Sequence, residues 1–331
     1  MKVGRQAKFW AIIILPLFMP LLVRSPFVLY AIAMMFTTII AALSLRLLRM
    51  TGVLSFAHAA FVGIGAYASA ILTTRLGLSF WVALPCAGLI CGIVSAIAGI
   101  PLIRVKLRGP YFFIATLAFA EIVLLIFTRW VGLFGGHSGI TGIAPPTFSL
   151  FGKVVYLSSD AALYYVAYGI LILSAFIMYQ IHHSRLCKLW HGIRDGELLA
   201  ESVGINVATW MLLAFVISSF FAGIAGSTYA HVAGGINPGS FSIDSMMVPL
   251  VLYVYAGGVD NFAGPIVGTV LIKAIGLGLR GMAVYETIFY GASMVVILVF
   301  CPQGLTSIRF GSLIKTKAFA RFWLERKREN T

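Results

Sequence analysis

Long apolar runs, interrupted at short intervals by glycine, proline and basic residues, fill almost the whole chain. A helix needs roughly 20 apolar residues to cross the hydrocarbon core of a bilayer. We expect ten spanning segments, at residues 9–23, 27–45, 53–73, 80–101, 111–131, 161–181, 208–230, 246–259, 264–280 and 285–301. The runs are continuous and lack the alternating pattern of barrel strands. The sequence therefore predicts an all-α polytopic membrane protein, with one transmembrane domain over residues 1–331.

The basic residues lie almost wholly on one side of these segments. With the N-terminus in the cytoplasm, eighteen of the 24 Lys and Arg residues lie in cytoplasmic segments. Five lie outside, and these are Arg24, Arg75, Arg129, Lys153 and Arg280. Because cytoplasmic loops carry such an excess, both termini are expected in the cytoplasm. The formal net charge of +14 then reflects orientation and contact with anionic membrane lipids, and nucleic-acid binding is not expected.

Two loops and the tail stand out between and after the spans. Residues 132–160 face outside and are rich in glycine, proline and serine, whereas residues 182–207 face the cytoplasm and carry many charges. The basic tail, 307–331, is predicted to anchor on the membrane surface. Within the cytoplasmic loop, Glu197 and Glu201 lie one turn apart on a short amphipathic helix that Gly204 would end. Spacing alone leaves two roles open, docking to a soluble partner or merely joining two spans.

Ionisable residues inside the spans are few, and each is a functional candidate because a charge in hydrocarbon is costly. Glu121 is expected deep in the fifth span, where it could relay protons, contact a substrate or be a buried, hydrogen-bonded acid. His58 fits a hydrogen bond between helices better than a ligand. Lys273 is expected to be structural, since a lysine side chain can extend toward the membrane surface.

Glycines mark a break in the eighth and ninth spans. Gly257 and Gly258, with Gly264 and Pro265, predict broken or short helices near 246–280, and such helices often border a substrate path. Elsewhere in the spans, small residues predict close helix packing. A weak internal repeat relates Ser55-Phe56-Ala57 to Asn261-Phe262-Ala263, each of which opens a span from the same side.

The sequence shows no pattern that would support chemistry by this chain alone. It has no HExxH or CxxC metal motif, no GxSxG hydrolase motif and no GxxxxGK[ST] phosphate loop. No metal or cofactor is therefore expected, and the chain is not expected to be an enzyme. If transport is driven by ATP, the ATPase must be a separate chain.

Four segments in register resemble the membrane permease subunits of bacterial ABC importers for branched-chain amino acids, in particular the larger of the two related permease types. They are GVLSFAHAAFVGIGAY at 52–67, RGPYFFIATLAFAE at 108–121, GGHSGITGI at 135–143 and IRDGELLAESVGIN at 193–206. Ala57, Phe134, Leu199 and Ser202 depart from the family's pattern.

The resemblance implies that 193–206 is the helix that couples the permease to the ATPase. The coupling candidates are Arg194, Asp195, Glu197, Ala200, Glu201 and Gly204. A substrate path is expected near Ser55, His58, Tyr111, Thr116 and Glu121. The implied partners are ABC ATPase subunits, a second related permease and an extracytoplasmic solute-binding protein, in a bacterial inner membrane. Two alternatives are a proton- or sodium-coupled secondary transporter that uses Glu121, and an integral membrane enzyme.

Overall fold

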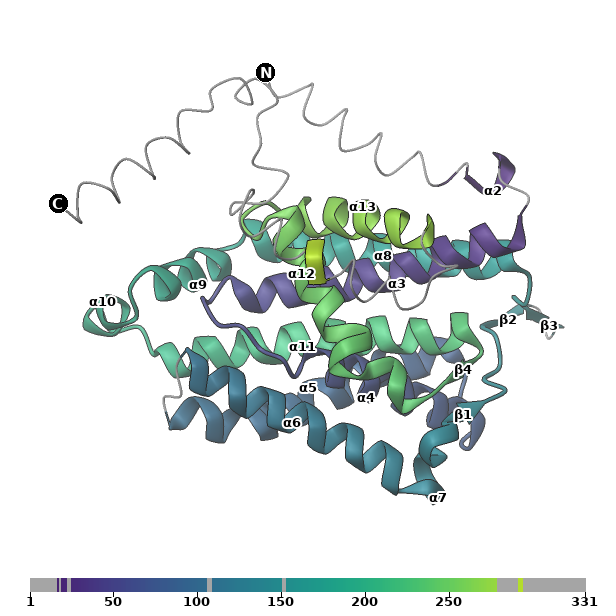
Figure 1. Cartoon of the computed structure of the whole chain (residues 1–331), viewed down its shortest axis with the longest axis horizontal. Helices are drawn as coiled ribbons and strands as arrows, with labels where there is room; N and C mark the ends of the chain where they lie inside the picture. The colour runs from purple at the N-terminus through teal and green to yellow at the C-terminus, as the bar shows by residue number, and fades with distance from the viewer. Residues whose placement is uncertain are drawn as a thin grey trace.

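The computed structural model describes residues 17, 19–22, 25–105, 109–150, 153–278 and 291–293. Five of its helices are long and apolar enough to cross a membrane, and they run side by side in one bundle (Figure 1). They are α3 Pro26–Arg49, α5 Phe80–Arg104, α6 Pro110–Arg129, α8 Asp160–His183 and α11 Val207–Ala233. Three shorter apolar helices join them, α4 His58–Thr74, the segment Ile243–Gly257 and α13 Gly264–Gly278.

These helices correspond to eight of the ten expected spans. The first and tenth expected spans, 9–23 and 285–301, lie almost entirely outside the described residues, as does the tail at 307–331. The third span was predicted too long, because residues 53–57 are irregular and helix α4 begins only at His58. The predicted loop 132–160 contains regular structure, namely α7 Val131–Phe134, η1 Gly136–Ser138, β1 Ile140–Thr141, β2 Thr147–Leu150 and β3 Lys153–Tyr156.

Helix α11 is the centre of the bundle and packs against α3, α4 and α5. Glycines make this packing close. A Cβ atom added at Gly226 would lie 1.9 Å from the backbone oxygen of Val62 in α4, and one at Gly65 would lie 2.4 Å from Gly223 in α11. Small residues at these positions let the helix backbones approach each other, as the sequence predicted.

The backbone between α11 and α13 is irregular. Gly234 ends α11 with a φ of 69°, and β4 Gly235–Ile236 pairs with β1 in antiparallel register. A short 3-10 helix, η2 Pro238–Phe241, and a π-helix, η3 Ile243–Met247, then lead directly into α12 Val248–Gly257. Phe241 packs against Tyr67 of α4, so this segment lies within the bundle.

The bundle has two ends that differ in structure (Figure 1). One end carries the four short strands, and we call it the strand end. The other carries α9 Arg185–Asp195 and α10 Glu197–Ser202, and we call it the α9–α10 end.

Candidate functional site

Helix α9 fixes the cytoplasmic-loop candidates to the bundle. The Ser184 side chain caps it by accepting a hydrogen bond from the Leu186 N–H at 3.2 Å. Cys187, Trp190 and Ile193 form its buried face. The Trp190 side chain is fully buried and donates from Nε1 to the backbone oxygen of Trp210 in α11, at 3.0 Å. Helix α9 is therefore anchored to α11, and the sequence analysis missed it because its charges suggested a solvated loop.

Helix α10 confirms the predicted short helix and its glycine end. Gly204 has a φ of 86°, its N–H donates to Glu201 O at 3.0 Å, and the Ile205 N–H donates to Ala200 O at 3.0 Å. These two bonds form the Schellman motif, which favours glycine. The expected single helix over 193–206 was wrong, however. The chain breaks at Gly196, so Arg194 and Asp195 belong to α9 and Glu197 begins α10.

Helix α10 presents apolar side chains to the outside. Ala200 is buried at 4% exposure, whereas Leu198, Leu199 and Val203 are 73%, 72% and 70% exposed. The sequence analysis placed Leu198 and Val203 on the same inward face as Ala200, but only Ala200 points into the protein. A cluster of exposed apolar side chains commonly marks a protein or membrane contact.

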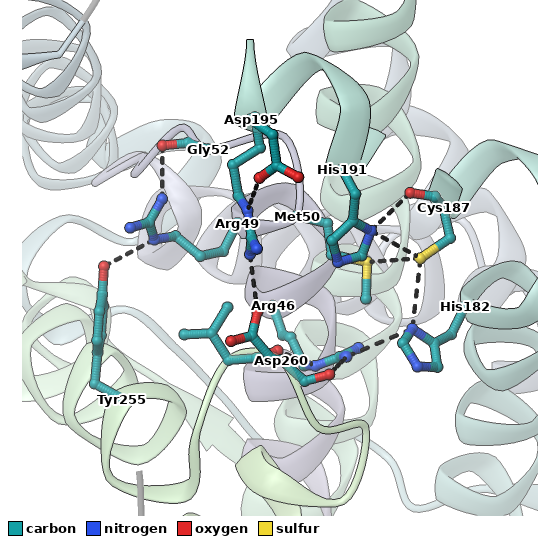
Figure 2. A network of polar contacts seen from close by, with 12 residues as sticks. Arg46, Arg49, Met50, Gly52, His182, Cys187, His191, Asp195, Tyr255 and Asp260 are labelled. Carbon is teal, nitrogen blue, oxygen red and sulfur yellow. Dashed lines mark hydrogen bonds and ion pairs between the residues drawn. The ribbon is translucent and has the colours of Figure 1, made fainter. Parts of the chain in front are cut away.

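Ionic and hydrogen-bonded contacts connect α9 with the turn between α12 and α13. The Arg194 guanidinium donates from Nη1 to the Asp260 carboxylate at 2.8 Å and also contacts Asp195 at 3.4 Å. Figure 2 shows Asp260 on the turn, with Asp195 and Arg46 on either side of it. The Arg194 guanidinium lowers the pKa of Asp260 by donating this hydrogen bond. Of the coupling candidates, Arg194 therefore has a defined partner that the sequence did not predict.

Arg46 holds the same turn from below. Its side chain is only 1% exposed, and it donates from Nε to Val259 O at 2.7 Å and from Nη2 to Asp260 O at 3.0 Å. These carbonyls follow the C-terminus of α12, where a cation is favourable. The sequence analysis counted Arg46 only as a loop charge, although an arginine inside an apolar run is itself a signal of a buried partner.

The segment before α4 is packed against these residues. Arg49 donates to Gly52 O at 2.6 Å and to the Tyr255 hydroxyl at 2.8 Å (Figure 2). Gly52 has a φ of 87°, and a Cβ there would lie 3.0 Å from Cγ of Arg194. Residues of α3, α9, α12 and the 50–53 turn therefore form one connected cluster at the α9–α10 end.

We expect Asp260→Asn to lower the melting temperature slightly at neutral pH. The Asp260 side chain is 78% exposed, so the pair should contribute only about 0.2–1 kcal/mol. Because the pKa of Asp260 is lowered from its ordinary 3.8 in the folded protein, this contribution is present above pH 3.8 and is lost as the pH falls through the lowered pKa. Melting curves of both proteins at two pH values test this. A difference in melting temperature that grows below pH 3.8 would contradict the assignment.

The expected substrate-path residues fall into two groups. Ser55, His58 and Thr116 are buried, at 0%, 1% and 0% exposure. Nε2 of His58 lies 2.7 Å from Oγ of Ser44 in α3, and Thr116 Oγ1 accepts from the Phe56 N–H at 3.1 Å. Tyr111, at 71% exposure, and Glu121 instead lie on the exposed face of α6. The structure thus brings three of the five together and turns the other two outward.

The break predicted at the glycines is present. Helix α12 ends at Gly257, Gly258 has a φ of 102°, and α13 begins at Gly264 with Pro265 in its first turn. A Cβ on Gly257 would lie 1.7 Å from the backbone oxygen of Gly264. The two helices therefore touch along their backbones, and whether this contact moves as a hinge stays a prediction.

The described part of the chain contains no group of three or more His, Cys, Asp or Glu side chains arranged to hold a metal ion. Cys187 does lie near two histidines, with its Sγ 3.3 Å from Nδ1 of His191 and 3.6 Å from Nδ1 of His182. Burial raises the pKa of the Cys187 thiol, which favours the protonated form and a packing role.

Comparison with known proteins gives relatives of one kind. The chain is 33% identical to the high-affinity branched-chain amino acid transport system permease protein LivM of Salmonella typhimurium over 275 residues, and 32% identical to that of Escherichia coli. Each alignment covers 77% of this chain and 64% of the relative, so it spans a little under two thirds of their length. A probable branched-chain amino acid transport permease protein LivH of Methanocaldococcus jannaschii is 26% identical, over 83% of this chain and 90% of that protein.

No solved structure matches the chain. The family described as "Branched-chain amino acid transport system / permease component" matches residues 27–298, which include every spanning helix discussed above. The protein therefore belongs to the family of permease components of branched-chain amino acid transport systems.

Proposed function

We propose that this protein is the membrane permease subunit of an ATP-driven ABC importer and forms the path for a branched-chain amino acid or a similar small polar solute. Family membership supports the transport role. The observation that carries the ATP-driven part is the outward apolar face of α10, with Leu198, Leu199 and Val203 exposed at the end of the bundle. A soluble partner that covers this face would remove it from water.

The partner at the α9–α10 end is an ABC ATPase subunit. The excess of basic residues places this end in the cytoplasm, where ATP is available. Movement of α10 would pass to α9 and from there to the bundle by two routes. One is the Trp190 hydrogen bond to α11, and the other is the Arg194 ion pair to Asp260 at the α12–α13 turn.

A second, related permease subunit is proposed to cover α6. This helix exposes Tyr111, Ile114, Ile122 and Leu125 together with Glu121 near its middle. An acidic side chain at that depth rarely faces lipid and usually meets protein or water. Contact with the partner permease would place Glu121 between two subunits and next to the path predicted from Ser55, His58 and Thr116.

The strand end is the proposed docking side for an extracytoplasmic solute-binding protein in a bacterial inner membrane. The antiparallel contact of Ile140 with Ile236 ties the external loop to the segment that follows α11. Docking there would therefore act on the irregular backbone between α11 and α12.

Affinity purification of the tagged chain from its native cells in mild detergent tests the proposal. We expect an ATPase with a phosphate loop and a second permease to co-purify in stoichiometric amounts, and the assembly to import solute into liposomes only with ATP. The contrary result is a chain that purifies alone and transports without ATP. A proton- or sodium-coupled transporter would then be the better description, and uptake by Glu121→Gln would be the next measurement.

A further inference from the structure

A cavity of about 420 Å³ lies inside the bundle, apart from the residues predicted to line the path. It is bounded by α3, α4, α11, α12, α13 and the irregular segment before α12. Its volume is within the range of small-molecule sites, roughly 300–1,000 Å³. Its polar wall includes Thr37, Thr38, Tyr229, Asn237, Ser240 and Lys273. So many polar groups between apolar helices indicate a hydrophilic ligand.

The cavity lies near mid-height of the bundle. Thr38 is the thirteenth of the 24 residues of α3, so it lies about 18 Å along a helix about 36 Å long. The Lys273 ammonium donates a hydrogen bond to Thr38 Oγ1 at 2.6 Å, and Thr38 donates to Met34 O at 2.9 Å. This bond fixes the charge at that depth and shows that Lys273 does not extend to the membrane surface, as the sequence analysis expected. A cation near the middle of a span is costly unless it serves a function.

The irregular backbone borders the same cavity. Asn237 Oδ1 accepts from the Ser240 N–H at 3.0 Å and stabilises the turn of η2, while Ser245 and Met246 line the cavity from the first turn of the segment Ile243–Gly257. Irregular backbone at membrane depth occurs where it is buried in protein or lines an aqueous cavity. The N-terminus of a helix carries partial positive charge. Two independent features, the ammonium and the helix start, therefore favour an anionic group.

The remaining wall is apolar. Ala41, Val62, Ala225 and Leu250 line it from α3, α4, α11 and α12. A ligand that suits the whole cavity carries a carboxylate at one end and a small aliphatic group at the other.

We propose that this cavity is the solute site of the permease and that it binds an α-amino acid with a branched aliphatic side chain. The carboxylate pairs with Lys273, and the side chain lies against Ala41, Val62, Ala225 and Leu250. This inference rests on the proposed function and deepens it. It assigns the recognition of the carboxylate to α13, outside the path predicted from Ser55, His58, Tyr111, Thr116 and Glu121.

The test uses the transporter purified with its co-purifying subunits and reconstituted in liposomes. Uptake of radiolabelled leucine is measured with saturating solute-binding protein, together with ATP hydrolysis. Lys273→Met should lower uptake at least about tenfold, because it removes a charge-assisted contact, while ATP hydrolysis and subunit composition stay within about twofold. Lys273→Arg keeps the charge and should retain more uptake than Lys273→Met.

A matched pair of threonines controls for the hydroxyl. Thr38→Val should lower uptake severalfold because it removes the bond that positions Lys273. Thr128 in α6 makes the same kind of bond, from its hydroxyl to Leu124 O at 2.8 Å, but it does not line the cavity. Thr128→Val should therefore leave uptake within about twofold of wild type.

The outcomes separate the two proposals. If the wild-type assembly imports leucine and Lys273→Met does so within twofold, the solute site is wrong and the permease function stands. If the wild-type assembly imports no branched-chain amino acid, the proposed function fails, and the solute site fails with it.

Should Lys273→Met not assemble, thiol labelling of Ser245→Cys gives an independent answer. Leucine should slow the reaction of the introduced thiol at least threefold, whereas leucinamide, which lacks the carboxylate, should not. Equal protection by both compounds, or by neither, overturns the proposal.

Discussion

Replacing Gly226 with alanine is expected to prevent stable folding of the chain. The added Cβ would lie 1.9 Å from Val62 O and 2.8 Å from Ala66 N, both backbone atoms of α4. A side chain could rotate away, but a helix backbone cannot, so α4 and α11 would have to separate. Helix α11 also packs against α3 and α5, so the separation would disturb the whole core. Overpacking typically costs about 1–3 kcal/mol, a large part of a stability of about 5–15 kcal/mol.

Size-exclusion profiles and melting temperatures of the purified variants measure this effect. Gly92→Ala is the matched control, because its Cβ would meet only Cγ1 of Val216 at 3.6 Å, an ordinary contact. We expect Gly92→Ala to give a monodisperse protein with nearly wild-type melting, and Gly226→Ala to aggregate or melt far lower. Equal behaviour of the two variants would show that α4 and α11 do not pack as described.

Changing Leu199 to aspartate on α10 is expected to abolish association with the ATPase while the chain stays folded. The Leu199 side chain is 72% exposed, so the substitution removes little internal packing. In a docked complex the same side chain would be desolvated, and burying an unpaired carboxylate there is costly. Central interface residues contribute about 2 kcal/mol or more, which corresponds to at least about a 25-fold loss of affinity.

The measurement is the amount of ATPase that co-purifies with the tagged variant, together with its melting temperature. Leu76→Asp is the control, because Leu76 is a leucine of similar exposure, 65%, at the strand end of the bundle. Leu76→Asp should retain the ATPase, and Leu199→Asp should lose it at an unchanged melting temperature. An undiminished ATPase band with Leu199→Asp would mean that another surface couples this permease to ATP hydrolysis.

Local properties of the sequence determined the helices and several of their ends. Apolar runs of sufficient length can satisfy their backbone groups in lipid only as helices, and this placed α3, α5, α6, α8 and α11 to within a few residues. The end of α10 followed from Gly204, since a left-handed position favours glycine. The break between α12 and α13 followed in the same way from Gly257, Gly258 and Gly264.

Only the tertiary structure decided which polar groups meet. The bond from Arg46 to Val259 O joins residues 213 apart, and the bond from Lys273 to Thr38 joins residues 235 apart. The direction in which Leu198 and Glu121 point was equally undetermined. A run that is apolar on all sides has no face that marks its neighbour, and helix contacts then depend on shape at a few glycines such as Gly226. The sequence determined what spans the membrane, whereas packing decided where its few charges lie.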